Sequence, residues 1–230
     1  MAKYVWCEDS ASGFQFWNAL FGNVYPDFLV ETKHSSSELS KAVGSISDDG
    51  NIYYIIIDTA VDNPDVQREL SRLNRNISGK TNVRIIKINS FEFSLLSFEH
   101  LENWVFAEND ELKENRRDLL EAKNIFVKLI TNGGSASDIN AFKTVYAHTA
   151  KKNTEKIAAY LLYNITRNTG FETDKSQVGA CFINSCCEWS ERQENDICGL
   201  DNDRPTVNDK MNMLINHSVL YSAFREAGLE

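Results

Sequence analysis

The sequence lacks the features of a membrane protein, a secreted protein or a disordered chain. It has only three prolines in 230 residues and is 42% hydrophobic, so we expect a sizeable core and no long disordered segment. No apolar run approaches the roughly 18 residues that a membrane-spanning helix needs. The strand expected at residues 3–7 leaves no room for a secretion signal, so we expect no membrane anchoring and no secretion.

An excess of basic residues is also missing. The net charge is −9, the sequence pI is about 5.0, and neither half of the chain carries a basic tail. Passive binding to nucleic acid needs a basic face, so this mode of binding is not expected. A protein that works through divalent metal ions could still engage phosphates, because the ions supply the positive charge.

The cysteines are few and odd in number. There are five, and four of them follow the pattern Cys181-x4-Cys186-Cys187-x10-Cys198, with His217 further along. An odd count without a secretion signal favours a reducing cytoplasm over a disulfide framework. A structural Zn²⁺ site needs four ligands, but paired Cys-x-x-Cys spacing is absent. We therefore expect small, buried apolar residues here, with a zinc site as the alternative.

Strands and helices are expected to alternate four times in the first half of the chain. The predicted strands cover residues 3–7, 27–31, 52–58 and 83–88, and the third is apolar enough to be buried on both faces. This alternation predicts an α/β fold with a mostly parallel, Rossmann-like sheet and helices on both faces.

The pattern changes in the second half. We expect an α/β domain at residues 1–109 and a helical region with the cysteine cluster at 110–230. Between them, residues 91–98 are interpreted as a loop or short strand, followed by a helical turn that carries Glu102 back towards the sheet edge.

Acidic residues follow two of the predicted strands directly. Glu8 comes after the first strand and Asp58 ends the third, with Asp62 in the following turn. Carboxyl ends of parallel strands share one edge, where ligands bind in open α/β sheets. Carboxylates there, including Glu102, are suited to Mg²⁺ or Mn²⁺. The alternative is that Asp62 caps the next helix and Glu8 merely follows a strand.

These acids and their order resemble the topoisomerase-primase (TOPRIM) fold over residues 3 to about 106. The strand ending in Glu8 resembles the first TOPRIM motif, whose glutamate is a general acid or base. The strand ending at Asp58 resembles the second motif, whose acids hold the metal. The stretch Leu101-Glu102-Asn103-Trp104 is similar to a Glu-Asn signature of TOPRIM-like proteins in bacterial defence systems.

The resemblance implies a divalent-metal-dependent effector that cleaves phosphodiester bonds in nucleic acid, in anti-phage defence, together with a protein partner such as an ATPase. One position departs from the family. The second motif is normally Asp-x-Asp, whereas this chain has Asp58-Thr59-Ala60, and Ala60 cannot bind metal. The alternative is therefore a catalytically degenerate TOPRIM-like subunit that acts through protein binding.

Overall fold

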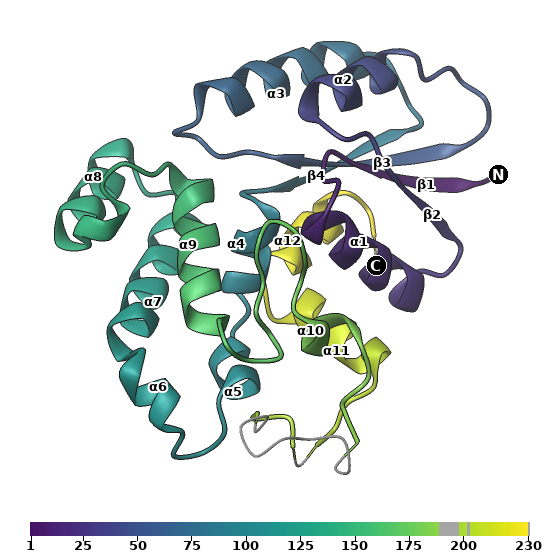
Figure 1. The fold of residues 1–230 in the computed structure, drawn as a ribbon. Helices are drawn as coiled ribbons and strands as arrows, with labels where there is room; N and C mark the ends of the chain where they lie inside the picture. Colours follow the sequence, from purple (N-terminus) through teal and green to yellow (C-terminus); the bar gives the residue numbers. More distant parts are fainter. Residues whose placement is uncertain (189–197, 202, 230) are drawn as a thin grey trace.

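The protein is built on a parallel β-sheet with helices on both faces (Figure 1). The computed structural model describes residues 1–188, 198–201 and 203–229. Within these ranges the sheet has four strands in the order β2-β1-β3-β4. The strands are β1 (Lys3–Cys7), β2 (Phe28–Thr32), β3 (Ile52–Asp58) and β4 (Val83–Ile88). The predicted α/β fold class is confirmed.

Helices connect the strands and form most of the second half of the described chain. They are α1 (Ser12–Val24), α2 (Ser36–Gly44), α3 (Pro64–Ile77), α4 (Phe91–Leu96), α5 (Leu101–Val105), α6 (Glu111–Asn115), α7 (Arg117–Thr131), α8 (Ala136–Val145), the 3₁₀ helix η1 (Ala147–Thr149), α9 (Thr154–Thr166), α10 (Ala180–Ile183), α11 (Val207–Asn216) and α12 (Leu220–Glu226).

Strand β3 is central and divides the hydrophobic core into two parts. Side chains alternate across a strand, so Tyr53, Ile55 and Ile57 join one buried cluster while Tyr54 and Ile56 join the other. The strand pairs in parallel with β1 on one side and β4 on the other. Both faces are therefore buried, which explains the continuous apolar run in the sequence.

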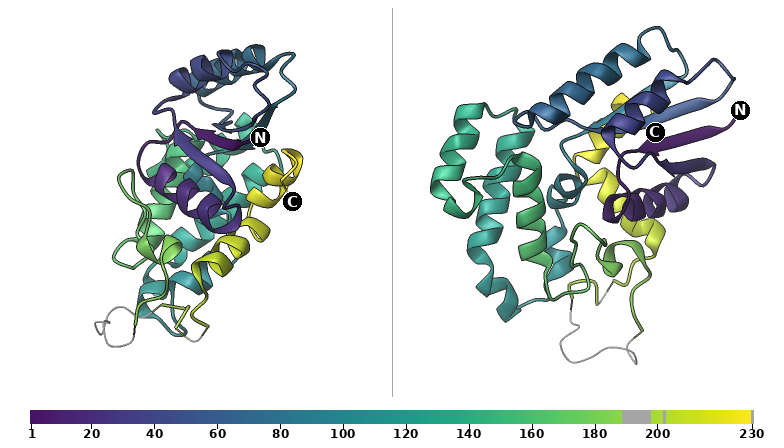
Figure 2. Two further views of the ribbon diagram at one scale, coloured as in Figure 1. Left: turned by 90° about the vertical axis from the view of Figure 1, so that its right-hand side faces the viewer. Right: turned by 45° about the horizontal axis from the view of Figure 1, so that its top comes forward.

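The two faces of the sheet are covered by different helices (Figures 1 and 2). Helices α2 and α3 lie on one face, where Leu39 and Leu73 are fully buried in the smaller cluster. Helix α1 lies on the other face, and the C-terminal helices pack against it. The rings of Phe21 on α1 and Phe224 on α12 stack with centroids 5.6 Å apart. The end of the chain thus returns to the sheet layer.

The expectation of a loop or short strand at residues 91–98 is wrong, because this stretch contains helix α4. Ser90 caps the helix, accepting a hydrogen bond from the backbone N–H of Phe93 at 3.1 Å. Phe93 then packs edge-on against Phe126 of α7, with ring centroids 5.9 Å apart. Nearly every α4 side chain is buried, so the sequence lacks the amphipathic period that identifies a surface helix.

Candidate metal and catalytic site

The strand-end acids Glu8 and Asp58 line one pocket of about 510 Å³. They come from β1 and β3, which are adjacent and parallel, so both carboxylates are delivered to the same sheet edge. Among the described residues, the pocket is lined by seven acidic side chains and one cationic side chain, which are Glu8, Asp9, Asp58, Asp65, Glu69, Glu92, Glu155 and Lys175. The pocket is thus strongly acidic.

Burial and the charges of neighbouring acids raise the pKa of four of these carboxyl groups, which are Glu8, Asp9, Asp58 and Glu92. Burial, followed by the charges of Glu8 and Asp9, raises the pKa of Asp58 well above its usual value. Burial also raises the pKa of Glu8, while a hydrogen bond from Ser36 acts in the opposite direction. The pKa of Glu92 is likewise raised by burial. Such a group of carboxylates is unfavourable unless protons or cations neutralise part of the charge.

Asp9 is held in place by helix α1. Its Oδ2 accepts a hydrogen bond from the indole N–H of Trp17 at 2.9 Å. Burial raises the pKa of Asp9 to about 6, although this hydrogen bond lowers it. The carboxylate lies so close to the helix that a Cβ on Gly13 would come within 2.4 Å of the Asp9 Cγ. Because Gly13 has no side chain, the Asp9 carboxylate can occupy this space.

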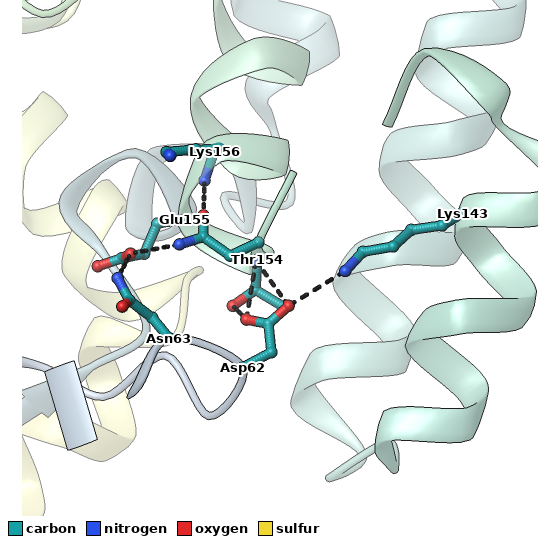
Figure 3. Close-up of polar contacts among 7 residues, drawn as sticks. Asp62, Asn63, Lys143, Thr154, Glu155 and Lys156 are labelled. Atoms are coloured by element: carbon teal, nitrogen blue, oxygen red, sulfur yellow. Dashed lines mark hydrogen bonds and ion pairs between the residues drawn. The ribbon is translucent and has the colours of Figure 1, made fainter. Parts of the chain in front are cut away.

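Glu155 reaches the pocket from the helical region, at the start of α9 (Figure 3). Its Oε2 accepts hydrogen bonds from the side-chain amides of Asn63 at 2.6 Å and Asn153 at 3.2 Å. Asn63 is also the N-cap of α3, where its Oδ1 accepts the backbone N–H of Asp65. The pocket is therefore assembled from both halves of the chain.

Asp62, expected as a metal ligand, is turned towards the helical region instead (Figure 3). Its Oδ1 accepts the backbone N–H of Thr154 at 2.9 Å and the Thr154 hydroxyl at 2.7 Å. Its Oδ2 lies 3.3 Å from the ammonium group of Lys143. Asp62 does not line the pocket, and its capping partner is α9 rather than the α3 helix that follows it in sequence. It anchors the helix that carries Glu155.

Glu102 also lies outside the pocket. Helix α5 is separated from the sheet by α4 (Figure 1), and the carboxylate of Glu102 pairs with Lys113 at 2.9 Å. The helical turn that was expected here exists, but it does not return Glu102 to the strand ends. Ala60, at the position where the family has its second aspartate, is completely buried.

Five of the seven pocket acids were missed in the sequence, among them Asp9, Glu92 and Glu155. Asp9 directly follows Glu8, and Glu92 follows β4 at the start of α4, so the rule that selected Glu8 and Asp58 would also select these two. Glu155 carries no comparable signal, because it is not near any strand in sequence. Only the packing of α9 against the β3–α3 loop brings it to the pocket.

The four clustered cysteines lie near one another in the structure. Burial, followed by interaction with Cys198, raises the pKa of Cys181 to about 11, and Cys187 and Cys186 contribute in the same direction. Among the described residues, however, no three of these sulfur atoms lie within 4.8 Å of one another. Cys181, Cys186 and Cys198 instead pack against the hydrophobic core. All four cysteines are only partly buried, so the expectation of buried residues is not fully met.

No helix in the described part of the chain combines the length and apolarity needed to span a membrane. Comparisons of the chain with protein-family models, curated proteins and solved structures found no match. The TOPRIM resemblance therefore depends on the strand-end acids and their order along the chain.

Proposed function

We propose that the acidic pocket binds Mg²⁺ or Mn²⁺ and that the protein cleaves phosphodiester bonds in nucleic acid. One observation carries this proposal: Glu8 and Asp58, at the ends of neighbouring parallel strands, face a pocket where burial and then the charges of other carboxylates raise the pKa of Asp58. Carboxylate oxygens are the donors that these hard cations prefer. A divalent ion would relieve the repulsion that the fold imposes.

The pocket residues divide into ligands and a proton carrier. Asp58, Asp9 and Glu155 would hold the ion through carboxylate oxygens. Their side chains would have to move together on binding, because no three carboxylates of the described pocket residues have ligand atoms within 4.8 Å of one another. A bound ion supplies charge that stabilises the phosphate and the leaving oxygen. Glu8 would take a proton from the attacking water or give one to the leaving oxygen. Its pKa is raised towards neutral pH, which suits a general acid or base. The exposed Lys175 would contact a phosphate at the rim.

The cellular role and the compartment are expectations from the sequence. The family resemblance implies a defence effector that works with a protein partner, and the cysteine content favours the cytoplasm.

A second candidate is a TOPRIM-like subunit that has lost catalysis and acts through protein binding. The environments of Asp62 and Ala60 favour this candidate. The carboxylate of Asp62 already contacts Thr154 and Lys143. Ala60 is buried and has no side-chain atom that could bind a metal ion. With the second motif reduced to Asp58, a second metal ion would depend on acids from elsewhere in the pocket.

The test is to incubate the purified chain with plasmid, single-stranded DNA and RNA in Mg²⁺ or Mn²⁺. We expect cleavage that is abolished by Glu8→Gln and by Asp58→Asn. The matched controls are Glu121→Gln and Asp27→Asn, which make the same chemical changes at exposed positions outside the pocket. Cleavage that survives both pocket changes would show a contaminating nuclease. Metal binding without cleavage would favour the second candidate.

A further inference from the structure

A second group of metal-ligating side chains lies where helices α5 and α11 meet. Glu99 and His100 precede α5, and His217 follows the last residue of α11. None of the three lines the acidic pocket. Among the described residues, this is the one group of at least three histidine, cysteine or acidic side chains whose ligand atoms all lie within 4.8 Å of one another.

The backbone fixes the two segments together. The N–H of Glu99 donates to the carbonyl oxygen of His217 at 2.9 Å. Two residues away on each segment, the N–H of Val219 donates to the Ser97 hydroxyl at 3.2 Å. The two chain segments that carry the three side chains are thus held together by one main-chain hydrogen bond and one bond to a side-chain hydroxyl.

The side chains already approach one another. The Nδ1 atom of His217 lies 3.5 Å from the Oε2 atom of Glu99, and the imidazole rings of His100 and His217 have centroids 4.8 Å apart at 65°. Ligands of a tetrahedral zinc ion are roughly 3.3 Å apart, given bonds of about 2.05 Å. Small side-chain rotations would therefore bring two nitrogens and one oxygen into this arrangement.

An ion pair between Glu99 and His217 explains less of the arrangement. The two side chains are 72% and 44% exposed, and such a pair contributes little to stability. The ion pair also does not explain why a ligand atom of His100 lies close to those of Glu99 and His217, while the His100 ring packs edge-on against Phe98. The nearby Lys123 interacts with Glu99 and would weaken cation binding, so the affinity should be below that of a four-ligand structural site.

We propose that Glu99, His100 and His217 bind a transition-metal ion of the Zn²⁺ type, with water completing the coordination. Two imidazoles and one carboxylate form a donor set typical of zinc sites that keep an open position. This set differs from the all-carboxylate pocket, which favours Mg²⁺ or Mn²⁺. The ion would join the start of α5 to the end of α11.

The test is a Zn²⁺ titration of the full chain after chelator treatment, with Co²⁺ absorption as a second measurement. We expect binding to weaken at least tenfold in His100→Asn and in His217→Asn. The matched control is His34→Asn, an exposed histidine at positive φ (65°), where asparagine is tolerated. Glu99→Gln, at an exposed position, gives a variant that should fold normally and also bind more weakly.

The bound Co²⁺ should show ligand-field bands without the intense near-ultraviolet charge-transfer band of a thiolate ligand. Zinc should also raise the midpoint of thermal unfolding of the wild-type chain but not of His217→Asn. The proposal is overturned if all variants bind as the wild type does. It is equally overturned by a Co²⁺ thiolate band that His217→Asn leaves unchanged, since the metal would then belong to the cysteines.

Discussion

The side-chain amide of Asn63 donates a hydrogen bond to the carboxylate of Glu155 at 2.6 Å, across 92 positions of sequence. This contact joins the loop after the central strand to the first turn of α9. Beside it, Asp62 binds the backbone and hydroxyl of Thr154. The acidic pocket is consequently a joint product of the sheet and the helical region, and disturbance of this junction should alter the pocket.

Asp62 should therefore behave as a structural residue. Asp62→Ala removes the acceptor for the Thr154 N–H and hydroxyl and the partner of Lys143, so we expect a loss of about 1–2 kcal/mol in the free energy of unfolding. Urea unfolding measures the loss, with Asp27→Ala as an exposed control. A stability equal to that of the control, together with complete loss of Mn²⁺ binding, would restore Asp62 as a direct ligand.

Asp58 should have opposite effects on stability and on metal binding. Asp58→Asn removes a repelled, buried carboxylate, so in the absence of metal the variant should be more stable by about 0.5–2 kcal/mol. The same change should abolish Mg²⁺-dependent stabilisation, because the ion loses a ligand. Thermal unfolding with and without Mg²⁺ checks both effects. A destabilised variant that Mg²⁺ still protects would contradict this account.

Gly13 should be required for the position of Asp9. A Cβ at this residue would lie 2.4 Å from the Asp9 Cγ, so Gly13→Ala should displace the carboxylate and weaken metal binding. Gly22→Ala in the same helix is the matched control, since nothing lies within 4 Å of its Cβ. The control should be stabilising by about 0.5–1 kcal/mol. Equal metal affinities in the two variants would show that Asp9 is not a ligand.

The stability of the metal-free protein should depend on pH through Asp9. Its pKa is raised from 3.8 to about 6, so the folded state holds the proton more tightly than the unfolded state does. The resulting stabilisation is fully present below about pH 4 and is lost as the pH rises through about 6. At pH 7 the free energy of unfolding of Asp9→Asn should thus exceed that of the wild type by only about 1–2 kcal/mol, because the side chain is partly exposed and solvent screens its charge. At pH 4 the two should differ little.

The quantity to measure is the difference in the free energy of unfolding between Asp9→Asn and the wild type. Other acids change the stability of both proteins with pH in the opposite direction. The pKa of Asp138 is lowered by its hydrogen bond with Ser135, and that of Asp209 by its bond with Thr206. Such groups lose stabilisation as the pH falls. If Asp9→Asn differed from the wild type equally at pH 4 and pH 7, the raised pKa of Asp9 would be ruled out.

Much of the sheet could be predicted because its strands have strong local signals. The apolar run of β3 and the alternation of strands with helices predict the parallel sheet, and the strand-end rule then selects Glu8 and Asp58. Helix α4 could not be recognised, since a short helix buried on nearly all sides has no amphipathic period. The roles of Asp62 and Glu155 depend on the long-range packing of α9 against the β3–α3 loop, which no local pattern in the sequence encodes.

The most direct test of the central claim is the position of Mn²⁺ in crystals of the full chain, located by anomalous diffraction. The account predicts a peak in the acidic pocket, within bonding distance of the Asp58 carboxylate and next to Glu8. That peak should disappear in crystals of Asp58→Asn. A pocket without an anomalous peak at saturating Mn²⁺, or a peak at Asp62 or Glu102 instead, would contradict it.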